Sequence, residues 1–100
     1  MERAVFVEKC REIKETGTAM SEMQVRNRIR NHADMNKDIS ICIGELAELS
    51  LELTRYQRGK MNGEDFLQEL SHVQWAIWTL QEHFDVSDED LLTAIQASFR

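Results

Sequence analysis

The sequence contains no proline, and only four of its 100 residues are glycine. Because proline and glycine dominate tight turns, a β-sandwich or β-barrel, which needs a turn about every ten residues, is excluded. Most other residues are good helix formers such as Leu, Glu, Ala and Gln. The chain is 42% hydrophobic and 30% charged, as expected for a folded protein. We therefore predict a single all-α domain over residues 1–100.

Long apolar runs and cysteines are also scarce. No run approaches the roughly 18 apolar residues of a membrane-spanning helix, so we expect no contact with a membrane. The N-terminal residues alternate charged and apolar side chains, unlike the apolar centre of a signal peptide. The only cysteines, Cys10 and Cys42, lie too far apart for a zinc-knuckle motif, and two are too few for a disulfide framework. The simplest interpretation is a reduced, cytoplasmic protein.

Charge is distributed unevenly along the chain. Residues 1–33 carry seven basic and five acidic residues, a net charge of +2, whereas residues 34–100 carry five and thirteen, a net charge of −8. The acidic part would repel nucleic acid, whose phosphates bind Lys and Arg. We therefore predict no nucleic-acid partner. A phosphate ligand remains compatible if a cation lies between it and the acids.

Hydrophobic periodicity divides the chain into an N-terminal helical segment, residues 1–35, and a core, residues 36–100. Helices are predicted over residues 2–15, 36–58 and 64–84, and a short one follows Ser87. Residues 18–34 leave two alternatives open. Either Thr18 or Ser21 caps another helix, or the polar stretch from Arg26 breaks it. The 36–58 and 64–84 helices are joined by a short connection and should form a central antiparallel hairpin.

The predicted helices have broad apolar faces, which we expect to form the core. On the 36–58 helix this face comprises Ile39, Cys42, Ile43, Leu46, Leu49, Leu53 and Tyr56. On the 64–84 helix it comprises Phe66, Leu70, Val73, Ile77, Leu80 and Phe84, and on the last helix Leu91, Leu92, Ile95 and Phe99. Trp75 and Trp78 lie on another side of the 64–84 helix. One small chain has few elements to cover both sides, so we predict a homo-oligomer, at least a dimer, with the tryptophans near its interface. His32 and His83 are expected at the surface.

An acidic stripe runs beside the apolar face of the 36–58 helix. Glu45, Glu48 and Glu52 recur at i, i+3 and i+7, which places them on one side of a helix. The 64–84 helix offers Glu69 and His72 at i, i+3, and an antiparallel hairpin can bring the two sets together. Two carboxylates 6 Å apart repel by about 3 kcal/mol at an effective dielectric constant of 20. Converging acids must therefore bind a cation, take up protons or move apart; otherwise the stripe is simply solvated.

Two stretches resemble the all-α nucleoside triphosphate pyrophosphohydrolases of the MazG-like superfamily: IGELAELSLELTRYQRGK and FLQELSHVQWAIWTLQEHF. That family carries ExxE on one helix and ExxD on the next. Glu45 and Glu48 match the first motif and Glu69 begins the second, but His72 stands where the family has Asp. The resemblance covers about residues 36–99.

The resemblance implies a dimer or tetramer of helical bundles that releases pyrophosphate from a nucleoside triphosphate. The implied metal ligands are Glu45, Glu48, Glu69 and His72, with Glu48 also the catalytic residue. The implied cofactor is Mg²⁺, and the imidazole of His72 makes Mn²⁺ possible. Glu52 could replace the missing carboxylate.

Two questions stay open at this point. The basic side chains of Arg55, Arg58 and Lys60 could contact the phosphates, or they could pair with Glu52 or be solvated around the turn. The alternative function is a catalytically inactive helical oligomer that binds a nucleotide or a protein.

Overall fold

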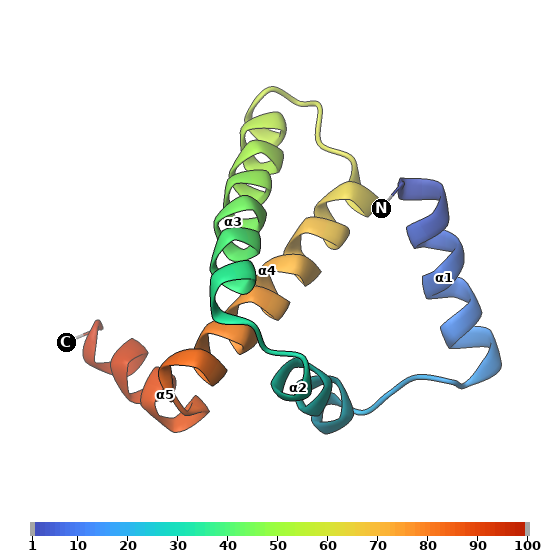
Figure 1. Cartoon of the computed structure of the whole chain (residues 1–100). Helices are drawn as coiled ribbons and strands as arrows, with labels where there is room; N and C mark the ends of the chain where they lie inside the picture. The colour runs from blue at the N-terminus through green and yellow to red at the C-terminus, as the bar shows by residue number, and fades with distance from the viewer. Residues whose placement is uncertain (1, 100) are drawn as a thin grey trace.

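The computed structural model describes residues 2–99, and every regular element in that range is an α-helix. The predicted all-α fold is therefore confirmed (Figure 1). No helix in the described part of the chain is long and apolar enough to cross a membrane. The helices are α1 (Arg3–Thr16), α2 (Glu22–Asn31), α3 (Met35–Gln57), α4 (Gly63–Phe84) and α5 (Asp88–Ala97).

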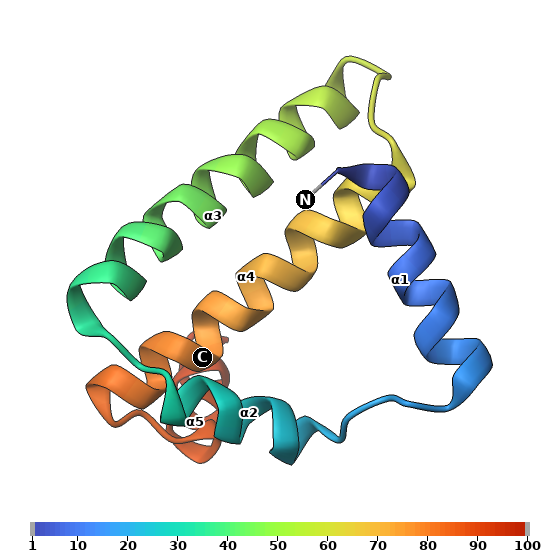
Figure 2. The same ribbon diagram turned by 45° about the vertical axis from the view of Figure 1, so that its right-hand side comes forward.

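Helices α3 and α4 form the predicted antiparallel hairpin, with α4 at the centre of the molecule (Figures 1 and 2). The turn between them uses Gly59, whose φ of 71° lies in the left-handed region that glycine tolerates. Asn62 begins α4 by accepting hydrogen bonds from two backbone N–H groups. Two small buried residues meet between the helices, because the Cys42 Sγ lies 3.8 Å from the Ala76 carbonyl oxygen. Their size lets the two helices approach closely enough to bring polar side chains into contact.

The N-terminal segment contains a second helix, which settles the alternatives that its sequence left open. Ser21 caps α2 through a reciprocal capping box with Gln24, so the polar stretch after Arg26 does not break it. The preceding helix, α1, ends at Gly17 in the left-handed conformation. An extended link joins the two helices, and no residue of α1 is buried.

Helix α2 lies against the tryptophan-bearing side of α4. Trp75 shares a hollow with Val25 and Ile29 of α2. The Arg26 guanidinium lies 5.3 Å from the centre of the Trp78 ring, a cation–π distance. Arg26 also donates two hydrogen bonds, of 2.8 and 2.9 Å, to Asp88 at the start of α5. Helix α2 of the same chain therefore covers the tryptophan-bearing side of α4, which the sequence predicted to be covered by a second copy.

Much of the predicted core is exposed, contrary to the expectation from periodicity. Ile43 is 65% exposed and Leu46 is 50% exposed. Other exposed side chains that were predicted to be inside are Leu53, Tyr56, Leu70, Ile77, Phe84, Leu92, Ile95 and Phe99. The prediction was wrong for these residues because the hairpin closes along a narrow seam, and the remaining helices cover another side of α4. Two apolar stripes, one on α3 and one on α4, thus remain open.

His83 is not at the surface, so that prediction was also wrong, whereas His32 is exposed as expected. Only 9% of the His83 side chain is exposed, and its Nε2 lies 2.8 Å from Asp38 Oδ2. Burial opposes ionisation of Asp38, but the backbone N–H of Asp34 and the His83 ring outweigh it and lower the pKa of this carboxyl. The pair joins the start of α3 to the end of α4.

Candidate metal centre

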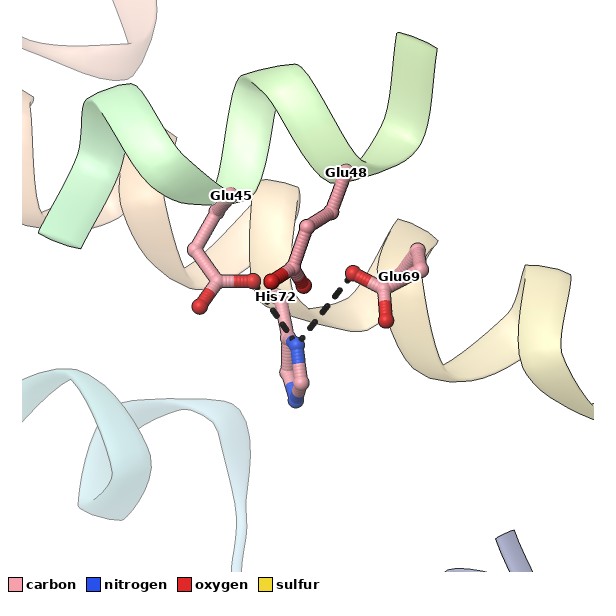
Figure 3. A group of neighbouring side chains, drawn as sticks. All are labelled: Glu45, Glu48, Glu69 and His72. Carbon is pink, nitrogen blue, oxygen red and sulfur yellow. Dashed lines mark ion pairs between the residues drawn. The ribbon is translucent and has the colours of Figure 1, made fainter. Parts of the chain in front are cut away.

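Four side chains converge at the middle of the α3–α4 hairpin. Glu45 and Glu48 stand one turn apart on α3, and Glu69 and His72 stand one turn apart on α4. One potential ligand atom from each lies within 4.8 Å of the others. Figure 3 shows the side chains of the two helices pointing toward one another. The structure thus brings together all four residues that the sequence proposed as metal ligands.

The polar atoms of this cluster contact one another without forming hydrogen bonds. His72 Nδ1 lies 2.8 Å from Glu45 Oε2 and 3.7 Å from Glu69 Oε2. All three atoms are buried, and none has a hydrogen-bond partner among the described residues. The 2.8 Å contact is therefore not aligned as a hydrogen bond. Buried polar atoms without partners are costly, and these three share one small space that suits a cation.

The carboxyl of Glu69 has a raised pKa. Burial raises the pKa of this carboxyl, the nearby Glu48 carboxylate raises it further, and the result is a pKa of about 6. The ordinary value is 4.5, so repulsion and burial favour the protonated form. The electrostatic influence of the nearby His72 ring acts in the opposite direction and lowers the pKa of Glu69. Of the three responses open to converging acids, proton uptake therefore begins at Glu69, as the pH falls below about 6.

The cluster lines one side of an open hollow of about 450 Å³. Glu48 is exposed, whereas the other three members are half-buried. The hollow is also lined by Leu51, Glu52, Arg55 and Gln68. Sequence reasoning placed Glu52 on the acidic stripe, and it does reach the hollow. It lies outside the four-residue cluster, however, and it forms an ion pair with Arg55.

The three basic residues near the turn occupy different places. Arg55 lines the hollow, whereas Arg58 and Lys60 lie in the turn after α3 and do not line it. Both are exposed. The sequence indicates why Arg55 alone of the three lines the hollow. Its i, i+3 spacing from Glu52 places it on the acidic side of α3.

Comparison with protein-family models, with curated proteins and with solved structures finds no match for the chain. The chemistry of the site therefore rests on its own geometry. Three carboxylates and one imidazole around a small space can hold a divalent cation. The hollow beside them leaves room for a ligand that contacts such a cation.

Proposed function

We propose that this chain is a divalent-metal-dependent pyrophosphohydrolase of a nucleoside triphosphate, similar to the MazG-like enzymes. One observation carries the proposal: Glu45, Glu48, Glu69 and His72 each offer a ligand atom within 4.8 Å of the others, beside an open hollow. Glu45, Glu48 and Glu69 stand at motif positions of the resemblance, and His72 takes the place of the last motif Asp. Proteins leave open coordination positions on Mg²⁺ and Mn²⁺ for substrate phosphates.

The donor set fits a divalent cation and favours Mn²⁺ over the usual Mg²⁺. Three carboxylates provide the oxygen ligands that Mg²⁺ prefers. His72 provides a nitrogen ligand, which suits Mn²⁺ better. When bound, a divalent cation neutralises phosphate oxygens and lowers the pKa of water. In this proposal Glu45, Glu48, Glu69 and His72 hold the cation, and Glu48 has a second task.

Glu48 would serve as the general base. It is exposed to the hollow, whereas its three neighbours are half-buried. Water attacks the α-phosphorus of the nucleoside triphosphate, and its proton passes to Glu48. The bond between the α-phosphorus and the bridging oxygen breaks. Pyrophosphate and a nucleoside monophosphate leave the site.

The assembly proposed with this function is a homodimer that covers the open apolar stripes. Ile43, Leu46 and Leu53 form one stripe on α3, and Leu70 and Ile77 lie on another on α4; all are at least 40% exposed. A stable dimer buries about 1,600 Å² in total, and large apolar side chains supply most of the binding energy. Sedimentation at micromolar concentration should give twice the mass of one chain. The double variant Leu46→Glu and Leu70→Glu should sediment with the mass of one chain. A wild-type protein that sediments as a monomer would exclude the proposed dimer.

The activity is tested with a panel of nucleoside triphosphates, assayed for pyrophosphate in Mg²⁺ and then in Mn²⁺. We expect release with at least one nucleotide, and faster release in Mn²⁺. Glu48→Gln keeps the shape of the side chain but removes the base, so its rate should fall by at least about 100-fold. The control is Glu89→Gln, which removes a carboxylate on α5, outside the site. It should leave the rate unchanged. If no nucleotide is hydrolysed but one still binds, the inactive binding module is the correct alternative.

A further inference from the structure

Glu52 is the most deeply buried carboxylate at the hollow. It is 4% exposed, and it stands one turn beyond Glu48 on α3. Its Oε1 contacts the Arg55 guanidinium. Its Oε2 is buried and has no hydrogen-bond partner among the described residues. A buried carboxylate requires a nearby positive charge, and Arg55 supplies it.

The ion pair with Glu52 occupies only part of the Arg55 guanidinium. Nη1 contacts Glu52, which leaves other N–H groups of a five-donor guanidinium available. The side chain is 47% exposed and lines the same hollow as the four-residue cluster. No Lys or other Arg lines the hollow within the described part of the chain. Arg55 is therefore the permanent positive charge among four glutamates.

We infer that Arg55 binds the phosphate chain of the substrate and that Glu52 is a positioning residue that holds the guanidinium toward the hollow. This inference rests on the proposed function. A polyphosphate cannot approach four carboxylates unless positive charge offsets them. A guanidinium binds phosphate oxygens through two parallel N–H groups, which fixes direction as well as charge.

The neighbouring basic residues provide the matched control. Arg58 lies one turn after Arg55, is exposed and does not line the hollow. Replacing either arginine with Gln removes the same charge from the same end of α3. A general effect of net charge would therefore weaken ligand binding equally in both variants, whereas a direct contact would affect Arg55→Gln alone.

The experiment measures two dissociation constants by calorimetry. The first is for Mn²⁺ alone, and the second is for inorganic pyrophosphate presented as its Mn²⁺ complex. Arg55→Gln should bind Mn²⁺ at least as tightly as wild type, because a positive charge is removed. Its dissociation constant for the pyrophosphate complex should rise about tenfold to a hundredfold. Arg58→Gln should match wild type in both measurements.

Glu52→Gln separates positioning from metal binding. In the positioning role, Mn²⁺ alone binds this variant as it binds wild type, and the pyrophosphate complex binds several-fold more weakly. If Glu52 is instead a metal ligand, the constant for Mn²⁺ alone rises, and its positioning role is overturned. Should Arg55→Gln lose its helical circular dichroism, Arg55→Lys carries the test. Lysine retains the charge but not the two parallel donors, so a smaller rise is expected.

The outcomes also separate this inference from the proposed function. A wild-type protein that binds no Mn²⁺ contradicts the proposed function and the inference together. The role of Arg55 alone is overturned if the wild-type protein binds both probes and the two variants, Arg55→Gln and Arg58→Gln, have the same dissociation constant for the pyrophosphate complex.

Discussion

Millimolar Mn²⁺ is expected to raise the melting temperature of the wild-type protein, and to raise it more than Mg²⁺ does. The cation offsets three converging carboxylates and binds the folded state alone. At a concentration 100 times its dissociation constant, a ligand stabilises a protein by about 2.7 kcal/mol. For a domain of this size that corresponds to a rise of about 10 °C or more. Thermal denaturation with each ion measures the effect.

The variant His72→Asp should reverse this preference. It replaces an imidazole nitrogen with a carboxylate oxygen, which Mg²⁺ accepts more readily. The rise in melting temperature with Mg²⁺ should then exceed that of the wild type. Glu45→Gln should greatly reduce the response to both ions. His32→Asp, a change at an exposed histidine outside the cluster, is the control and should respond like wild type. A melting temperature indifferent to both ions would end the metal hypothesis.

The metal-free protein should lose stability as the pH rises from 4.5 to 7. The pKa of Glu69 is about 6 in the folded state and 4.5 without the fold's influence. Between these values the folded state holds more protons than the unfolded state, so the free energy of unfolding falls with increasing pH. The stabilisation is fully present below pH 4.5 and is lost as the pH passes 6. A shift of this size corresponds to about 2 kcal/mol.

Urea denaturation at a series of pH values, with the metal removed by a chelator, measures this loss. Glu69→Gln resembles the protonated carboxyl at every pH, so the decline from pH 4.5 to 7 should be smaller by about 2 kcal/mol in this variant. Glu64→Gln, on the first turn of the same helix, is the control and should decline like wild type. Saturating Mn²⁺ should remove most of the wild-type decline, since the cation stabilises the carboxylate. Parallel pH profiles for wild type and Glu69→Gln would refute the proposed cause.

The hairpin and its site could be predicted because both depend on local spacing. Glu45 and Glu48, like Glu69 and His72, are separated by three residues, and this spacing fixes which side chains share a helix face. The alignment between the helices could not be derived in the same way. The two helices approach closely where Cys42 meets Ala76. Periodicity does not distinguish such a close contact from an open apolar face.

Other features required contacts between distant parts of the chain. Asp38 and His83 are separated by 45 residues, so no local pattern pairs them. Helix α2 is polar, and its sequence gave little sign that Arg26 would connect Trp78 to Asp88. Ile43 and Leu46 were expected to be buried because periodicity identifies apolar faces. It does not reveal whether the same chain covers them.

A cysteine buried in the narrow seam between α3 and α4 can report the separation of these two helices. Cys42 is 2% exposed, and burial, aided by Asp38 and Glu45, raises the pKa of its thiol. Because thiol reagents attack the thiolate, Cys42 is protected both by contact and by protonation. Cys10 on α1 is only half-buried, so its thiol is less protected by contact than that of Cys42. The slow phase of thiol modification therefore reports how often α3 separates from α4 in the folded protein.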